Sequence, residues 1–313
     1  MIRLAIVSPC YNEEEILESS ARKLTATLVE LASKGKAGPG SFILFVNDGS
    51  SDSTWEIISS LHGKDPRIKG ISLAHNVGHQ NAMVAGMLTA RPECDAVVTI
   101  DADIQDDLSG IEKMLDAFEA GNEVVYGVKV ERSADPFLKR KSAEAFYRLM
   151  EKMGVDTVYN HADFRLMSRK VLDAFADYPE TNLYLRALVK KIGFKYTTVE
   201  DHISSREAGH SKYSPAKMFA LAVDGITSFT DKPLYLIMYS GIVFVAISIL
   251  VLVYTVVSLI MGRAVPGWTS LMLSCWFIGG VILIALGIIG IYLGKTFMES
   301  KRRPRYNISD RLF

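Results

Sequence analysis

Apolar residues follow two alternating patterns along the first 130 residues of this chain. Short apolar runs predict buried strands at residues 1–7, 42–46, 68–73, 96–100 and 124–128. Between these runs apolar residues recur at helical spacing, and they predict helices that include residues 17–31, 55–61, 79–89 and 111–118. Asn12 is expected to cap the first helix, with Glu15 at the capping-box position. Strands that alternate with helices predict an α/β fold with a mainly parallel sheet of the nucleotide-binding type.

Residues 137–232 have a less regular pattern. They contain a basic helical stretch from about residue 137, a strand-like run at residues 164–167 and a basic loop. Ser214 and Pro215 then fit the cap and first residue of a helix with one apolar face. That helix could lie in the lipid headgroup layer or pack on the globular domain, and both interpretations stay open.

Two long uncharged runs, at residues 234–260 and 268–293, predict two transmembrane helices, since about 20 apolar residues cross a bilayer. Arg263 is the only charged residue in the connection between them, whereas the tail that follows the second run is strongly basic. This bias predicts that the tail and the N-terminal domain both lie in the cytoplasm, at an inner or plasma membrane. The expected domains are a catalytic domain, a basic loop with an interfacial helix, two transmembrane helices and a basic cytoplasmic tail, at residues 1–200, 201–232, 233–294 and 295–313.

Composition narrows the classes of partner. The chain has 35 basic and 35 acidic residues, so no global charge favours a nucleic-acid partner. Its three cysteines are far apart and fit neither a disulfide framework nor a paired metal site. The first residues lack the pattern of a signal peptide, which agrees with a cytoplasmic catalytic part.

Polar residues follow three of the predicted strands, at residues 9–13, 48–52 and 101–105. The carboxyl ends of parallel strands meet at one edge of a sheet, where ligands bind. Asp101 and Asp103 are two residues apart, so on an extended segment both carboxylates could face one Mg²⁺ or Mn²⁺ and its phosphates. The alternative is a solvated acidic turn.

The three segments together resemble the family 2 glycosyltransferases of the GT-A (Rossmann-like) fold. Their markers are a Pro-x-Tyr-Asn-Glu opening, an Asp-Gly-Ser turn and an Asp-x-Asp, which stand here at residues 9–13, 48–50 and 101–103. The resemblance implies that Asp103 and Gln105 hold the divalent ion. It implies a set of contacts to the nucleotide sugar from Pro9, Tyr11, Asn12, Glu13, Val46, Asp48, Asp101, Ala102 and Lys129. Asp52, the last residue of the polar segment at residues 48–52, could cap the next helix instead of contacting the nucleotide sugar.

Within that family the chain is similar to the polyprenyl-phosphate glycosyltransferases, which include bactoprenol glucosyltransferases and dolichyl-phosphate mannose synthases. Residues 160–168 match the acceptor-side segment of the bacterial members, and residues 206–213 match their basic loop before the membrane. Lys129 departs from the Arg that mannose synthases tend to have there, so a point charge replaces a bidentate fork.

A lipid phosphate presents its charge at the headgroup plane, so an enzyme that uses it needs cations between its catalytic domain and the membrane. Arg206 and Lys212 have that place in the sequence, and Arg132, Lys139 and Arg140 could assist from a neighbouring helix. Asp163 would orient the acceptor or accept a proton, with Arg165 and Arg206 on the phosphate; the alternative is an Asp163–Arg165 ion pair. The expected catalytic residues are Asp103, Asp163 and Arg206.

The resulting hypothesis is a metal-dependent, single inverting transfer of a hexose to undecaprenyl phosphate, with UDP-glucose or UDP-N-acetylglucosamine as the favoured donor. The alternatives are a GDP-mannose-using synthase, a membrane polysaccharide synthase and a silent membrane scaffold. The chain has no Gln-x-x-Arg-Trp segment of the kind that polysaccharide synthases use. Gly290 and Gly294 could let helices pack closely, so a homo-oligomer is compatible with the sequence.

Overall fold

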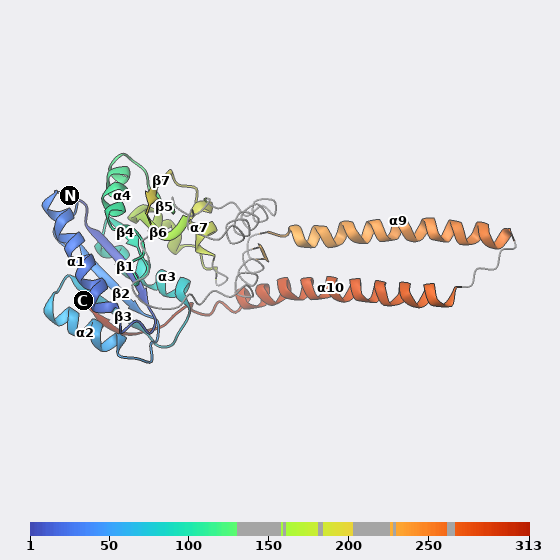
Figure 1. Cartoon of the computed structure of the whole chain (residues 1–313), viewed down its shortest axis with the longest axis horizontal. Coiled ribbons are helices and arrows are strands. Elements are labelled where there is room, and N and C mark those ends of the chain that lie inside the picture. The colour runs from blue at the N-terminus through green and yellow to red at the C-terminus, as the bar shows by residue number, and fades with distance from the viewer. Residues whose placement is uncertain (130–157, 159–160, 181–183, 203–225, 228–229, 262–266) are drawn as a thin grey trace.

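The structure is a computed structural model of the whole chain, and Figure 1 shows a globular part from which two long helices extend. It describes residues 1–129, 158, 161–180, 184–202, 226–227, 230–261 and 267–313. Several predictions fall outside these residues, namely those for Arg132, Lys139, Arg140, Arg206, Lys212 and the helix start at Ser214.

One sheet forms the centre of the globular part, in the order β7-β5-β6-β4-β1-β2-β3-β8. The five predicted strands and the strand-like run at residues 164–167 are confirmed, and two more strands join them. The strands are β1 (Leu4–Cys10), β2 (Phe42–Asn47), β3 (Ile68–Leu73), β4 (Ala96–Thr99), β5 (Val124–Lys129), β6 (His161–Ser168), β7 (Tyr196–Asp201) and β8 (Ile308–Leu312).

Helices cover both faces of the sheet, because side chains alternate between the faces of each buried strand. On β1, Leu4 and Ile6 belong to the core beneath α1 (Leu17–Ser33), α2 (Thr54–Lys64) and α4 (Ser109–Glu119). Ala5 and Val7 belong to the opposite core. That core lies beneath α3 (His79–Ala90), α6 (Arg169–Ala176) and α7 (Leu185–Lys191), and a short 3-10 turn, η1 (Arg91–Glu93), follows α3.

The first helix differs from its prediction at its start. The apolar residues at helical spacing in α1 are all buried, namely Leu17, Ala21, Leu24, Leu28 and Leu31. The helix begins at Leu17, however, and Asn12 does not cap it. Asn12 instead adopts a positive φ of 53°, and its side-chain oxygen accepts a hydrogen bond from the Ser51 amide at 2.9 Å. The capping-box prediction was therefore wrong, because Asn12 connects the loops after β1 and β2.

The sheet directs one set of strand ends toward the long helices. Strands β1, β2, β3 and β4 pair in parallel, whereas β6 pairs antiparallel with both β4 and β5. The N-terminus lies at the end of the globular part that is far from the long helices, so β1 runs toward them (Figure 1). The carboxyl ends of the parallel strands and the beginning of β6 therefore meet at the edge that faces those helices.

The long helices α9 (Lys232–Ile260) and α10 (Trp268–Ser300) run side by side in opposite directions (Figure 1). At their base the Tyr292 hydroxyl donates to the Thr230 carbonyl at 2.6 Å. Within the described residues one segment, Phe277–Ser300 of α10, is long and apolar enough to span a membrane, with a mean hydropathy of 2.4 and no burial inside the protein.

The basic tail after α10 returns to the globular part, which the sequence did not predict. β8 pairs antiparallel with β3, and the Ser309 hydroxyl donates to the Ser72 carbonyl at 3.1 Å. The chain thus leaves the sheet before α9 and rejoins the same sheet after α10.

Candidate active site

The carboxyl edge of the sheet brings together the three polar segments that follow β1, β2 and β4. Lys129, the last residue of β5, lies at the same edge, and β6 enters it from the opposite direction with Asp163 and Arg165. The register fixes this contact, since Thr99 of β4 is opposite Arg165 and the Thr99 hydroxyl donates to the Asp163 carbonyl at 2.5 Å. The segment after β4, predicted to bind the sugar nucleotide, and the segment in β6, predicted to bind the acceptor, are therefore adjacent.

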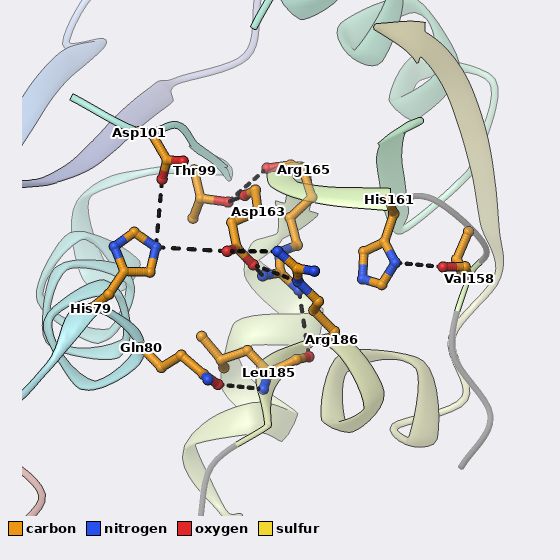
Figure 2. Close-up of polar contacts among 10 residues, drawn as sticks. All are labelled: His79, Gln80, Thr99, Asp101, Val158, His161, Asp163, Arg165, Leu185 and Arg186. Carbon is orange, nitrogen blue, oxygen red and sulfur yellow. Dashed lines mark hydrogen bonds and ion pairs between the residues drawn. The ribbon is translucent and has the colours of Figure 1, made fainter. Parts of the chain in front are cut away.

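Asp163 is the centre of a cluster of charged side chains (Figure 2). Its Oδ1 accepts a hydrogen bond from Arg165 Nη2 at 2.9 Å, and its Oδ2 is 3.4 Å from Arg186 Nη2. Burial alone would raise the pKa of Asp163, but Arg186, His79 and Arg165 hold that pKa well below its usual value. Asp163 is therefore a carboxylate that stays ionised and bound to cations.

Arg165 lies below the surface of this cluster. Its side chain is 1% exposed, and Nη1 also donates to the Leu185 carbonyl at 3.4 Å. The ion pair with Asp163, which the sequence left as an alternative, is thus present. Arg186, on α7, is 32% exposed and was missed by the sequence analysis. Arg186 is therefore the more accessible of the two guanidinium groups.

His79 connects this cluster to the segment after β4 (Figure 2). Its Nε2 lies 3.5 Å from Asp101 Oδ1 and 3.7 Å from Asp163 Oδ2. Burial lowers the pKa of His79, but Asp163 and Asp101 outweigh that effect and raise the pKa above its usual value. The helix that begins at His79 was predicted, whereas the role of its first side chain was not.

The segment after β4 is a turn and not an extended strand. The Ile104 amide donates to the Asp101 carbonyl at 3.1 Å, so the expectation that Asp101 and Asp103 point the same way by strand alternation was wrong. Ile104 is buried at a φ of 41°, which is costly for a β-branched residue. Such strain persists where the surroundings impose it and is common at functional sites.

The Asp101 side chain is 49% exposed, yet its Oδ1 is buried and receives no hydrogen bond from the described residues. Burial raises the pKa of Asp101; His79 and Lys129 oppose this effect, and Asp163 and Asp103 add to it. Ala102 is buried, and its carbonyl accepts from the Ser20 hydroxyl at 2.5 Å.

Asp103 and Gln105 flank the strained Ile104, and both are partly exposed. A carboxylate and an amide oxygen are ligands that suit Mg²⁺ or Mn²⁺, so this pair fits the expected ion when diphosphate oxygens complete its shell. Within the described ranges, no three His, Cys, Asp or Glu side chains are grouped to hold a metal by themselves.

Two further carboxyl groups lie beneath this turn. Asp106 and Asp201, the last residue of β7, are both buried, and Asp201 Oδ1 accepts from the Asp107 amide at 2.9 Å. Burial, together with the charge of Asp201, raises the pKa of Asp106 to about 8. Asp106 therefore holds a proton near neutral pH, and the Asp107 amide attaches the turn to β7.

Asp48, predicted to contact the nucleotide, is buried at the end of β2. Its two oxygens accept hydrogen bonds from the amides of Val77 at 2.8 Å and Gly78 at 3.1 Å. Gly49 follows at a φ of 62°, and a Cβ there would lie 2.5 Å from the Asn76 backbone. The Asp-Gly-Ser turn thus holds the loop that leads into α3.

The remaining predicted nucleotide contacts differ in exposure. Tyr11 is exposed, and the Glu13 amide donates to the Thr54 hydroxyl at 3.0 Å. Pro9 pairs with Val46 between β1 and β2, and the Val46 side chain is buried in the core, so any ligand contact of Val46 goes through its backbone. Asp52 accepts from the Thr54 amide at 3.1 Å and Glu14 amide at 3.2 Å, which supports the start of α2.

A separate concavity lies at the opposite edge of the sheet, near the start of β1 and β2. Its cations are already in ion pairs, so it offers little charge for an anionic ligand. The pairs are Arg3 with Asp95, Arg67 with Asp65, and Lys69 with Glu93.

The comparisons with known proteins agree with the resemblance read from the motifs. Residues 5–176 match the model of the glycosyl transferase family 2. A glycosyltransferase of Bacillus subtilis, YkoT, is 43% identical over 310 residues, which cover 99% of this chain and 92% of that protein. The bactoprenol glucosyl transferase of Shigella phage SfX is 36% identical over 312 residues, which cover 99% of this chain and 100% of that protein.

Among solved structures, the glucosyl-3-phosphoglycerate synthase of Mycobacterium tuberculosis is similar at 15% identity and a TM-score of 0.48, over 73% of this chain and 79% of that one. The family match and the near full-length relatives confirm the predicted family and the predicted enzyme class. The chain is a glycosyltransferase and belongs to glycosyl transferase family 2.

Proposed function

We propose that this enzyme transfers a hexose from a nucleotide diphosphate sugar to undecaprenyl phosphate at the cytoplasmic face of the membrane. The main support for this proposal is that two groups of residues, a donor side and an acceptor side, lie next to each other at the sheet edge that faces the long helices. The donor side is the turn that holds Asp101 and Asp103. The acceptor side is the cluster of Asp163 with Arg165 and Arg186.

The relatives named bactoprenol glucosyl transferases support a polyprenyl-phosphate acceptor, since they align with this chain from the catalytic domain through the helices. Their names favour glucose as the transferred sugar. A uridine nucleotide with glucose or N-acetylglucosamine is the donor that we expect, ahead of mannose from a guanosine nucleotide.

The reaction requires little base catalysis. A phosphate monoester has a second pKa of about 6, so much of the acceptor is dianionic at neutral pH. One acceptor oxygen attacks the anomeric carbon while the bond from that carbon to the diphosphate breaks, which inverts the configuration and releases the nucleotide diphosphate. Asp103 and Gln105 would hold Mg²⁺ or Mn²⁺, which supplies positive charge for the departing diphosphate.

Asp163 fits an orienting role better than a proton-accepting one. Its lowered pKa makes it a weak base, and its contacts with two guanidinium groups hold them in fixed positions. Arg186 then offers the accessible charge for phosphate, and the sequence adds Arg206, Lys212 and Arg132 as further candidates. Lys129 would contribute at the diphosphate.

Both long helices would cross the membrane. β8 rejoins the sheet that β1 began, so the chain must cross the bilayer an even number of times between them. If α10 spans the membrane, α9 must span it as well. The basic residues after α10 then place the catalytic domain in the cytoplasm.

This arrangement has a direct test in labelling of intact cells. A Cys at Arg263, in the short connection, should react with an impermeant thiol reagent from outside, whereas a Cys at Ser309 should react only after lysis. The opposite pattern would contradict the orientation, and no labelling of the Arg263 position from outside would contradict two crossings.

The transfer itself is tested with membranes that contain the protein. They are incubated with labelled sugar nucleotides, Mg²⁺ or Mn²⁺ and polyprenyl phosphate, and the label is followed into organic solvent. We expect a lipid-linked product with one uridine nucleotide sugar. If no donor gives a labelled product, a catalytically silent scaffold is favoured. If the label appears in a polymer, a polysaccharide synthase is favoured.

A further inference from the structure

His79 lies between the two sides of the site, and no step described above uses it. Its Nε2 is 3.5 Å from Asp101 Oδ1 and 3.7 Å from Asp163 Oδ2, so a single ring nitrogen faces both carboxylates (Figure 2). The Asp101 oxygen that it faces is the buried one that receives no hydrogen bond from the described residues. These distances exceed those of good hydrogen bonds, but catalytic contacts are often long without substrate and shorten in the complex.

Hydrogen bonds to two side chains fix the backbone on both sides of His79. Both oxygens of Asp48 bind the amides of Val77 and Gly78 immediately before it. On the other side, the Gln80 side chain accepts from the Leu185 amide at 2.9 Å, which joins the start of α3 to the start of α7. Arg186 follows Leu185, so the same contact positions the accessible guanidinium.

Helix stability does not explain a histidine at this position. The N-terminus of a helix carries partial positive charge and disfavours a basic side chain, and His79 is the first residue of α3. The imidazole is also partly exposed, so it does not fill the core. The two carboxylates in front of it give the physical reason for its presence.

We propose that His79 is a positioning residue that holds Asp101 of the donor side and Asp163 of the acceptor side at a fixed separation, through the N–H of Nε2. The inference rests on the proposed function, because it needs a donor and an acceptor that meet between these carboxylates.

Without His79 the two carboxylates face each other across the site with less positive charge between them. Asp101 then moves away from Asp163, and the sugar donor loses its alignment with the attacking phosphate. A misplacement of about 1 Å can cost about 10²-fold in rate. The loss should fall mainly on kcat, because the nucleotide contacts of the β1 and β2 loops are retained.

The experiment compares two amides of different reach. The side-chain nitrogen of Gln can occupy the place of Nε2, whereas that of Asn reaches only as far as Nδ1. We expect His79→Asn to lower kcat by about 10²-fold with donor and acceptor KM changed less than about threefold, and His79→Gln to recover at least about tenfold of that loss. His202→Asn, an exposed histidine beyond β7, is the matched control.

Wild-type kinetics in His79→Asn would overturn the proposal. An equal loss of kcat in His79→Asn and His79→Gln, with unchanged melting temperatures, would also overturn it. Such a result would mean that a hydrogen-bond donor at the position of Nε2 does not restore the function of His79.

A second readout does not depend on transfer. The ¹⁵N resonance of His79 Nε2, assigned by its loss in His79→Gln, should report a protonated nitrogen and should shift in Asp101→Asn. No shift would overturn the proposed contact. A wild-type enzyme that forms no lipid product but shows this shift would contradict the proposed function and leave the His79 contact standing.

Discussion

The two sides of the site each hold an aspartate, and the pKa values of these two aspartates are shifted in opposite directions. Asp163, on the acceptor side, is bound by two guanidinium groups that lower its pKa. Asp101, on the donor side, has a raised pKa and a buried oxygen without a hydrogen bond from the described residues. The acceptor side thus carries its own cations, whereas the donor side is built from oxygen ligands that suit a cation arriving with the nucleotide sugar.

The largest effect is expected from the donor side. Asp103→Ala should reduce transfer by about 10²–10³-fold, because the positive charge that stabilises the departing diphosphate is lost. The measurement is label incorporation into lipid at equal amounts of membrane-inserted protein. Asp116→Ala, on the exposed face of α4, is the control, and undiminished transfer by Asp103→Ala would refute the metal assignment.

The acceptor side should matter more for stability. Asp163→Ala leaves the buried Arg165 without its carboxylate, which should cost about 3–5 kcal/mol. Asp101→Ala, at a half-exposed position, should change stability by no more than about 0.5 kcal/mol. Denaturant unfolding in detergent measures both, and equal losses would contradict the distinction between the two carboxylates.

A smaller effect should distinguish the two roles open to Asp48. If its main role is to hold the loop before His79, Asp48→Asn should lower kcat by about tenfold in the same manner as His79→Asn. If nucleoside binding dominates, donor KM should rise while kcat stays constant. Steady-state kinetics with varied donor concentration separates these outcomes, and the second would contradict the account of the loop.

The smallest effect concerns Asp106 beneath the donor turn. Its pKa is about 8 in the folded protein and near 4 in an unfolded chain, so the folded state binds the extra proton and wild-type stability falls as pH rises from about 4 to 8. Asp106→Asn resembles the protonated form.

We therefore expect Asp106→Asn to melt higher than wild type at pH 8, by about 2–4 °C for each 1 kcal/mol gained. The difference should shrink as the pH falls and disappear below about pH 4, where the carboxyl group is protonated in the unfolded chain as well. Thermal melts across this range measure it, with Asp116→Asn as the control, and a difference that does not depend on pH would contradict the shared burial of Asp106 and Asp201.

Local patterns predicted much of the catalytic domain. Buried parallel strands appear as apolar runs, so β1 to β5 and the helices between them were anticipated. The strands that were missed lie at the sheet edges. β7 alternates between exposed and partly buried residues, and β8 is a polar segment whose pairing depends on the return of a tail more than 200 residues beyond β3.

The sequence indicated candidate residues where one short segment holds them, as at Asp101 to Gln105. It did not indicate His79 and Arg186, because their place in the cluster depends on contacts with Asp163, which is distant in the sequence. The αL conformation of Asn12 and the turn at Ile104 also come from tertiary packing. Local sequence patterns therefore predicted a helix cap at Asn12 and an extended segment after β4, and neither is present.

A chelation experiment on the purified enzyme, in vesicles that contain undecaprenyl phosphate, tests directly whether a metal-held sugar nucleotide is the donor and the lipid phosphate the acceptor. With labelled UDP-glucose and UDP-N-acetylglucosamine offered separately, we expect label in the lipid with one donor, its loss in excess EDTA and its recovery when Mn²⁺ or Mg²⁺ is restored. Equal transfer in excess EDTA would contradict the metal-held donor, and label that stays out of the lipid with both donors would contradict the proposed acceptor.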